Sequence, residues 1–320
     1  MMQSIASFFW LAVFGLAGVT TATANPSAVF QGTAHDAFYG LCYAGNNWTA
    51  VGQAGLVVTS RDAGKAWKIL PSFTDKALLD VSCNDEVSLA VGQEGIIYRQ
   101  TQNAFEPVVS PTNARLMAVS EVLADGFVVA VGGFGTILIS QDAGQNWRIV
   151  SVDWQSILND AIEPHLYDVS VSSSGQITIV GEFELVLTSD DFGRSWRTRN
   201  LGEASLFSVT IHDDGKGYAV GQDGRILKTL NGSESWEALE NPSDGILLNI
   251  WSSADGKVLV SGIRNLLTSN NGGASWTKVQ SGDFMSGWYQ GLWVGDAANE
   301  WGRSALLAGH QGNLIRLKLD

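Results

Sequence analysis

Basic residues are scarce in this sequence. The 320-residue chain has 19 Lys and Arg against 32 Asp and Glu, which gives a formal net charge of −13 at pH 7. Nucleic acids and anionic membranes bind basic surfaces, so this balance argues against both as partners. Charged residues of either sign make up only 16% of the chain and hydrophobic residues 45%, a composition that indicates a well-buried globular protein.

Motifs for common catalytic and metal chemistry are absent. The sequence contains no GxSxG, HExxH, CxxC or GxGxxG. Its few histidines lack the spacing of metal ligands and are His35, His165, His212 and His310. We therefore expect no metal, no cofactor and no catalytic residue.

The chain has little long apolar sequence. Its one extended run, residues 8–19, is too short to span a bilayer and is followed by an Ala-Thr-Ala segment that ends at Ala24, the small-residue pattern of a signal-peptide cleavage site. We interpret residues 1–24 as a signal peptide cleaved near Ala24, although no Lys or Arg precedes the apolar run. The mature protein, residues 25–320, is then expected in the periplasm or outside the cell, without direct membrane insertion.

Glycine and tryptophan are abundant, with 36 Gly and 12 Trp, and many of them belong to a repeated motif. The pattern Ser/Thr-x-Asp/Asn-x-Gly/Ser-x-x-Trp occurs five times. In a tight turn the Asp or Asn side chain can accept a backbone N–H bond, the Gly tolerates positive φ, and the Trp can pack beneath the hairpin. We expect the motif to stabilise the fold through Asp62, Trp67, Asp142, Trp147, Asp191, Trp196, Asn231, Trp236, Asn271 and Trp276.

A second signature, a glycine that follows two small or apolar residues, extends the count to seven. These glycines are separated by 40, 40, 49, 40, 41 and 47 residues. A period near 40 with four short strand-like segments is typical of propeller blades. We predict an all-β, seven-bladed β-propeller of four-stranded blades, without an amphipathic helix, whose blade glycines are Gly52, Gly92, Gly132, Gly181, Gly221, Gly262 and Gly309.

Two irregular repeats give further predictions. The seventh repeat ends after its third strand, residues 313–319, so we expect residues 26–31 to supply its outer strand and to close the ring. The second repeat lacks the turn motif and has Phe105 where the others have Trp. We expect its hairpin to form with a looser turn.

These repeats resemble the photosystem II assembly/stability factor family of cyanobacteria and plastids, which also has exported members in non-phototrophic bacteria. The resemblance rests on the AVGQxGxI segments, the S-x-D-x-G-x-x-W turns and the period near 40, and it covers residues 26–320. That family is built from BNR, or Asp-box, repeats in a seven-bladed propeller. The resemblance therefore implies the same fold as the strand pattern.

The resemblance also implies a non-enzymatic scaffold that assists assembly of a membrane complex by binding a partner. We expect a monomer that binds a protein of the cell envelope. The phototrophic members carry a basic patch for their partner, whereas this chain is acidic. A role in photosynthesis is implied by the resemblance alone.

The alternative function is that of an Asp-box glycoside hydrolase or carbohydrate-binding protein. A sialidase would need an Arg-Ile-Pro segment, and the nearest match is Arg148-Ile149-Val150. Other glycosidases need two opposed carboxylates, and a chain with 32 acidic residues always offers some pair. The sequence therefore names no catalytic residue for this alternative.

The long connections between repeats are the predicted binding region. Residues 150–166 and 280–290 should emerge on the same face as the turns after the repeat glycines, and loops on a rigid frame often bind partners. The predicted partner-binding residues of the two connections, whose aromatic side chains we expect to be exposed, are Trp154, His165, Phe284, Trp288 and Tyr289. The turns add Gln53, Gln93, Glu182, Gln222 and His310, whose side chains could instead satisfy the turn backbone.

The two cysteines, Cys42 and Cys83, are too few for a disulfide scaffold, although a disulfide could persist in an exported protein. They fall on the inner strands of neighbouring repeats and differ by one position in the alignment. Because alternate residues of a strand point to opposite faces, this displacement could turn them toward each other or apart. The sequence leaves a disulfide and two buried thiols as alternatives.

Overall fold

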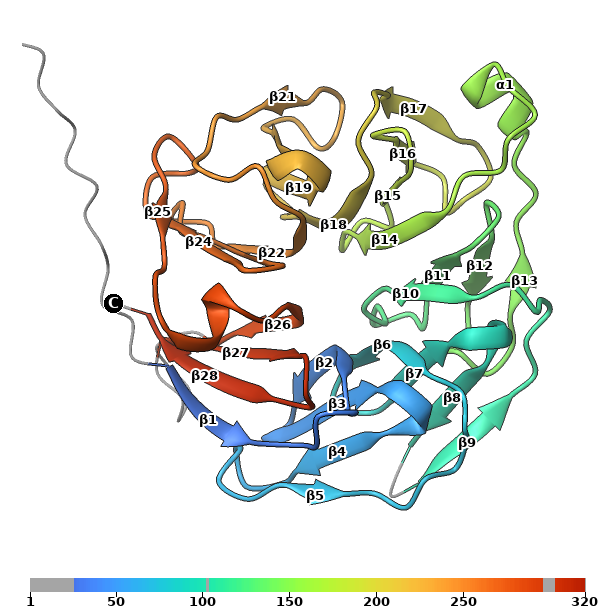
Figure 1. Ribbon diagram of the computed structural model, residues 1–320. Helices are drawn as coiled ribbons and strands as arrows, with labels where there is room; N and C mark the ends of the chain where they lie inside the picture. Colours follow the sequence, from blue (N-terminus) through green and yellow to red (C-terminus); the bar gives the residue numbers. More distant parts are fainter. Residues whose placement is uncertain (1–25, 102–103, 296–302, 320) are drawn as a thin grey trace, which may run out of the picture.

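The computed structural model describes residues 26–101, 104–295 and 303–319, so the predicted signal peptide, residues 1–24, lies outside the described residues. Seven four-stranded antiparallel sheets are arranged around a central axis, and the first strand of each sequence repeat is the innermost strand of its sheet (Figure 1). This arrangement confirms the predicted all-β, seven-bladed propeller.

The strands follow one order in every blade, from the axis outward. Blades 1 to 3 consist of β2 (Phe38–Ala44), β3 (Asn47–Gly52), β4 (Val57–Ser60) and β5 (Lys68–Ile69); β6 (Leu78–Cys83), β7 (Ser88–Gly92), β8 (Ile97–Gln100) and β9 (Phe105–Val108); and β10 (Leu116–Val119), β11 (Val128–Gly132), β12 (Ile137–Ser140) and β13 (Arg148–Ile149). Blades 4 to 6 consist of β14 (Leu166–Val171), β15 (Ile177–Gly181), β16 (Val186–Ser189) and β17 (Arg197–Asn200); β18 (Leu206–Ile211), β19 (Gly217–Gly221), β20 (Ile226–Thr229) and β21 (Glu237–Ala238); and β22 (Leu247–Ser252), β23 (Val258–Gly262), β24 (Asn265–Ser269) and β25 (Thr277–Lys278).

Blade 7 is assembled from both ends of the described chain. Its strands are β26 (Tyr289–Val294), β27 (Ser304–Gly309), β28 (Leu314–Lys318) and the outer strand β1 (Pro26–Phe30). The antiparallel pairing of β1 with β28 places Ser27 opposite Arg316, and Figure 1 shows the blue strand beside the red one. The predicted closure of the ring by the N-terminal strand is therefore confirmed.

Within the described residues, helical structure is confined to short segments between strands. The 3-10 turns are η1 (Gln53–Gly55), η2 (Gln93–Gly95), η3 (Gln222–Gly224) and η4 (Gly282–Met285). One short α-helix, α1 (Trp154–Leu158), which the sequence did not predict, lies at the rim of the ring. It begins because Asp153 is its N-cap and accepts a hydrogen bond from the Ser156 amide, at 3.2 Å.

Close approach of two backbone segments explains the seven repeat glycines. At each of them, an added methyl group would lie only 1.8–2.4 Å from a carbonyl oxygen just before the inner strand of the same blade. The amide after each glycine donates a hydrogen bond of 2.8–3.1 Å to that same oxygen. The period near 40 in the sequence is therefore the period of this contact, which fixes the turn after the second strand to the start of the blade.

The five turn motifs share one hydrogen-bond pattern. In blade 3, the Ser140 hydroxyl donates to Asp142 Oδ1 at 2.8 Å and accepts from the Gly144 amide at 3.0 Å. The same carboxylate oxygen accepts from the Asn146 amide at 2.9 Å. The equivalent groups of blades 1, 4, 5 and 6 make the same bonds. These side chains are thus committed to the turns.

The motif tryptophans pack less deeply than the sequence suggested. Each of the five is half-buried at the edge of a hydrophobic cluster between neighbouring blades. In blade 2, which lacks the motif, β8 and β9 still pair and place Gln100 opposite Phe105, a buried residue. Residues 102 and 103 of this turn lie outside the described part of the chain.

Candidate functional site on the loop face

One face of the ring carries both kinds of loop that the sequence singled out, and we call it the loop face. Backbone hydrogen bonds join its turns to its inter-blade connections, for example from Gly135 to Pro164 at 2.7 Å and from Arg264 to Gly287 at 2.8 Å. The connections are residues 31–37, 70–77, 109–115, 150–165, 201–205, 239–246 and 279–288, and the turns are residues 53–56, 93–96, 133–136, 182–185, 222–225, 263–264 and 310–313.

Three of the aromatic residues predicted for partner binding are buried. Trp154 packs into the core between blades 3 and 4 and closely covers Gly135, where a methyl group would collide with the indole. Phe284 and Tyr289 are buried together, with ring centroids 5.3 Å apart. Their predicted exposure is wrong, because short helical turns direct Trp154 and Phe284 inward and Tyr289 is buried as the first residue of β26.

The other predicted residues of the connections are half-buried at the loop face. Trp288 stacks on Tyr39, with centroids 5.8 Å apart and ring planes 10° from parallel. His310 meets the Tyr289 ring edge to face at 5.4 Å. In the other connection, His165 Nδ1 accepts a hydrogen bond from the Phe134 amide at 3.1 Å. The predicted residues of the two connections, together with His310, therefore form two groups, one in blades 3 and 4 and one around blade 7.

The polar residues that follow the repeat glycines bond mainly to the backbone. Side-chain oxygens of Gln93, Glu182 and Gln222 accept hydrogen bonds of 2.8–3.0 Å from amides just before the inner strands of their own blades. These three side chains support the turns, which was the alternative to partner binding. Gln53 is exposed.

This face also carries a group of exposed apolar side chains that was not predicted from the sequence. Phe134 is 66% exposed, Ile162 45%, Phe183 37% and Leu201 47%. We call these four residues the loop-face patch. Large exposed apolar groups that gather on one face mark interaction surfaces. A signal existed, because Phe134 and Phe183 occupy turn tips where the other blades have Ala54, Glu94, Asp223, Arg264 and Gln311.

The loop face is also strongly acidic. It carries thirteen acidic residues and four basic residues, which amounts to −9 of the chain's net charge of −13. The basic residues are Lys76, Arg115, Arg225 and Arg264, of which Lys76 pairs with Glu94 at 2.7 Å and Arg225 with Glu184 at 3.3 Å. The acidic residues are Asp36, Asp75, Glu94, Asp153, Asp160, Glu163, Glu182, Glu184, Glu203, Asp223, Glu240, Asp244 and Asp283.

The central channel is lined by the seven inner strands and encloses a cavity of about 530 Å³. Two of its carboxylates connect neighbouring blades: Asp80 accepts from the Val119 amide at 2.9 Å and Asp168 from the Val209 amide at 2.8 Å. Burial raises the pKa of Asp80 to about 7, helped by the charge of Asp168, and burial raises the pKa of Asp168 to about 6. Hydrogen bonds from the partner amides oppose both rises.

Because the pKa values of these two aspartates are raised, we expect the protein to become more stable on mild acidification. Because their pKa values are higher in the folded than in the unfolded state, their contribution to stability is complete below about pH 4 and is lost as the pH rises through 6 and 7. This dependence should amount to about 4 kcal/mol between about pH 5 and about pH 8, and the double variant Asp80→Asn/Asp168→Asn should lack it. Urea unfolding at both pH values measures it.

The comparison of the variant with the native chain isolates the two aspartates. Glu121 and His212 also line the channel and are present in both proteins, so the comparison leaves only the two replaced carboxylates as a difference. An equal change in stability with pH in the native chain and the variant would show that the aspartates do not titrate in this range.

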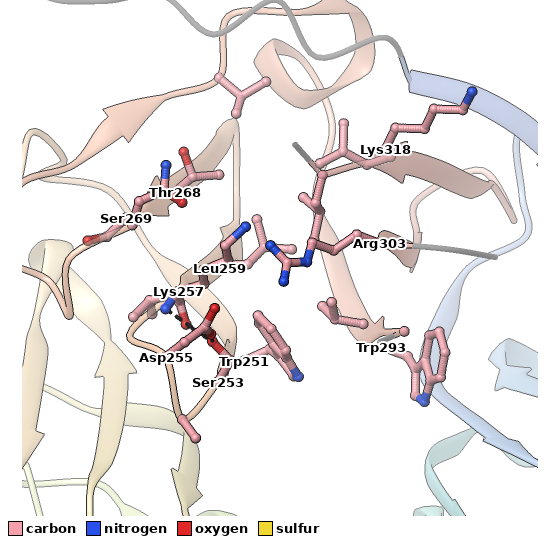
Figure 2. Close-up of a pocket in the computed structure, with 18 of the residues that line it drawn as sticks. Trp251, Ser253, Asp255, Lys257, Leu259, Thr268, Ser269, Trp293, Arg303 and Lys318 are labelled. Atoms are coloured by element: carbon pink, nitrogen blue, oxygen red, sulfur yellow. Dashed lines mark hydrogen bonds between the residues drawn. The ribbon is translucent and has the colours of Figure 1, made fainter. Parts of the chain in front are cut away.

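A second concavity lies on the opposite face, between blades 6 and 7. Its volume is about 860 Å³, and none of the predicted binding residues lines it. Figure 2 shows the indole of Trp251 and the guanidinium of Arg303 directed into the same space, with Asp255 beside Lys257. A hydrogen bond from Ser253 and the positive charges of Arg303 and Lys257 lower the pKa of Asp255.

The described residues contain neither a candidate membrane-spanning helix nor a candidate metal site. Within residues 26–101, 104–295 and 303–319, no helix is long and apolar enough to cross a membrane. In the same part of the chain, no three His, Cys, Asp or Glu side chains gather as a metal site would require.

Comparison with known proteins supports the fold. No family model and no curated protein matches the sequence. A solved structure of Ycf48 bound to a D1 peptide is similar, with a TM-score of 0.73 and 19% identity over 95% of this chain and 100% of that chain. Ycf48 from Cyanidioschyzon merolae has a TM-score of 0.72 and 16% identity over 92% of this chain and 98% of that chain. The chain therefore shares the seven-bladed fold of Ycf48 along nearly its whole length.

Proposed function

We propose that this protein is a non-catalytic scaffold that binds a protein partner through its loop face. The observation that carries the proposal is the loop-face patch, four exposed apolar side chains held on a rigid ring. Hydrogen-bonded turns and connections position the patch before a partner arrives, which lowers the entropy cost of binding. We further propose that the protein is exported as a monomer and assists a membrane complex of the cell envelope.

The likeness to Ycf48 supports a binding function. Ycf48 is a photosystem II assembly factor, and one of the two similar structures holds a peptide of D1. A propeller of the same fold can thus present a surface to a segment of another protein. For this chain, we extend the parallel to peptide or protein binding and leave the partner to be identified.

Replacing the two phenylalanines of the patch should weaken partner binding strongly. In the variant Phe134→Ser/Phe183→Ser, both substitutions remove exposed apolar surface, so binding should weaken by about tenfold or more while the melting temperature stays nearly unchanged. A photo-crosslinking amino acid at Leu201, followed by mass spectrometry from intact cells, would identify the partner and measure its capture.

The matched control is the variant Phe192→Ser/Leu230→Ser. Both residues are exposed in turn motifs between third and fourth strands, on the face opposite the loop face. This control should capture the partner as well as the native chain does. Equal capture by the Phe134→Ser/Phe183→Ser variant would contradict binding through the loop face.

A second candidate function, carbohydrate binding or glycoside hydrolysis, has its support in the concavity between blades 6 and 7. Trp251 could stack on a sugar ring, and Asp255 and Arg303 could bond to its hydroxyl groups. A screen of glycans and aryl glycosides with the purified protein tests this function. Hydrolysis that is lost when one carboxylate is replaced would overturn the scaffold proposal.

A further inference from the structure

We propose that the segment bound at the loop-face patch is basic and amphipathic, with Lys or Arg residues beside aliphatic or aromatic anchors. This inference rests on the proposed function and specifies the chemistry of the partner. Two independent features carry it: the bonded series of backbone segments that holds the apolar patch across blades 3 to 5, and the sign of the charge around it.

The backbone segments that carry the patch are bonded to one another in series. The turn that holds Phe134 contacts the next connection twice, through the bond to Pro164 and through His165, whose ring lies 5.0 Å from the Phe134 ring. The carbonyl of His165 accepts a hydrogen bond from the Glu182 amide at 3.0 Å, at the start of the next turn. This series connects blade 3 to blade 4.

The same series continues into blade 5. The carbonyl of Phe183 accepts a hydrogen bond from the Gly202 amide at 2.8 Å, which holds Leu201 beside it. Phe134 and Phe183 have φ values of 54° and 61°, the left-handed conformation in which a turn tip projects its side chain. The anchors of a partner would therefore meet a row of apolar groups that is already in place.

Exposed carboxylates border this row. Asp160 and Glu163 lie within two residues of Ile162, and Glu203 lies two residues from Leu201. On the basic side, Arg115 is exposed at the start of blade 3, while the blade 5 residue Arg225 is already paired with Glu184. The local balance is negative, in agreement with the charge of the whole loop face.

The negative charge around the patch distinguishes between basic and acidic partners. An acidic segment would be repelled on approach and would bring like charges together at the rim, whereas Lys and Arg residues would be attracted. Apolar anchors alone would not distinguish the two kinds of segment. The combination of an apolar row and an acidic rim therefore fits a segment that is apolar on one side and basic on the other.

Binding of synthetic peptides to the purified full chain tests the inference. The probe is a fluorescein-labelled peptide with Leu and Phe anchors separated by Lys, and its counterpart has Glu in place of every Lys. We expect the Lys peptide to bind about tenfold more tightly or better, and its affinity to fall as the salt concentration rises from about 50 mM to about 300 mM.

Variants of the protein test whether the residues in and beside the patch cause the preference for the Lys peptide. Glu163→Lys/Glu203→Lys should weaken the Lys peptide by about tenfold and reduce its salt dependence, because it reverses charge beside the patch. Asp85→Lys/Glu86→Lys changes the net charge equally at exposed positions of a turn on the opposite face, and should have a much smaller effect. The variant Phe134→Ser/Phe183→Ser should weaken both peptides.

Three results would overturn the inference: equal affinity for the Lys and Glu peptides, equal weakening by the two charge-reversal variants, or full affinity for the Lys peptide without the two phenylalanines. These results are distinct from failure of the proposed function. If crosslinking at Leu201 captures a partner through an acidic segment, the loop face binds proteins but the inference about the charge of the partner is wrong.

Discussion

Gly132→Ala should destabilise the protein by about 4 kcal/mol, whereas Gly133→Ala, one residue further on, should cost less than about 1 kcal/mol. A methyl group at Gly132 would lie 2.0 Å from the Arg115 carbonyl oxygen, which belongs to rigid backbone. At Gly133 the nearest atom would be His165 Nδ1 at 3.5 Å, an ordinary contact. Neither glycine has a left-handed φ, so the two variants differ mainly in available space.

Thermal unfolding followed by circular dichroism, with guanidinium unfolding as a second measure, compares the two variants. The large effect is expected because the Arg115 carbonyl also accepts the Gly133 amide at 2.8 Å, so relief of the clash would break this bond as well. Similar melting temperatures for both variants would show that the turn can move away from the inner strand, and would refute our explanation of the seven-fold glycine.

Removal of the disulfide should cost roughly 4 kcal/mol, the chain-entropy value for a loop of this length. Cys42 and Cys83 are bonded in the structure, with a Cα–Cα distance of 5.8 Å and a sequence separation of 41. The bond joins the inner strands of blades 1 and 2, so its loss frees a whole blade in the unfolded chain. The variant Cys42→Ala/Cys83→Ala should therefore melt at a lower temperature than the oxidised protein.

Reduction provides the control for this variant. The native chain in excess reductant should melt close to the double variant, and the variant itself should not respond to reductant. Titration of thiols after denaturation of the oxidised protein should find none. Two free thiols in that titration would rule out the disulfide in solution.

The fold could be predicted from the sequence because each blade repeats the same local requirement. The glycine period reports a backbone contact that any blade of this geometry must make, so it persists in blade 2 even though the turn motif fails there. The missing fourth strand of the last repeat, together with Pro26–Phe30, was enough to predict how the ring closes. These features depend on residues that are near in sequence or equivalent between repeats.

The candidate site was predicted less well, because the direction of a side chain in an irregular loop depends on contacts that do not repeat. Trp154 was expected at the surface, yet the Asp153 cap starts α1 and turns the indole into the core. Phe134 and Phe183 were overlooked because they occupy regular turns. The departure of a residue type from its repeat was in this case a better indicator of exposed apolar surface than the length of a connection.

Whether the two cysteines form a disulfide could not be predicted from the sequence, for a different reason. Their displacement by one alignment position left two outcomes open, and only the geometry of the two inner strands decides between them. Both strands have a bulge at the same place, between the first and the third residue, so the bulges leave this displacement unchanged. The packing of one inner strand against the next brings the two cysteines together, with a Cα–Cα distance of 5.8 Å.

The pairing of β1 with β28 has a consequence for the order of events during synthesis. Residues 26–30 leave the ribosome before the other strands, but their partner, residues 314–318, is made after them all. Until then, β1 has no partner and the edge of β27 that β28 covers is open, and such edges invite pairing with other chains. A truncation that removes only the final strand would therefore leave two sheet edges open, and the cell would have to shield both of them.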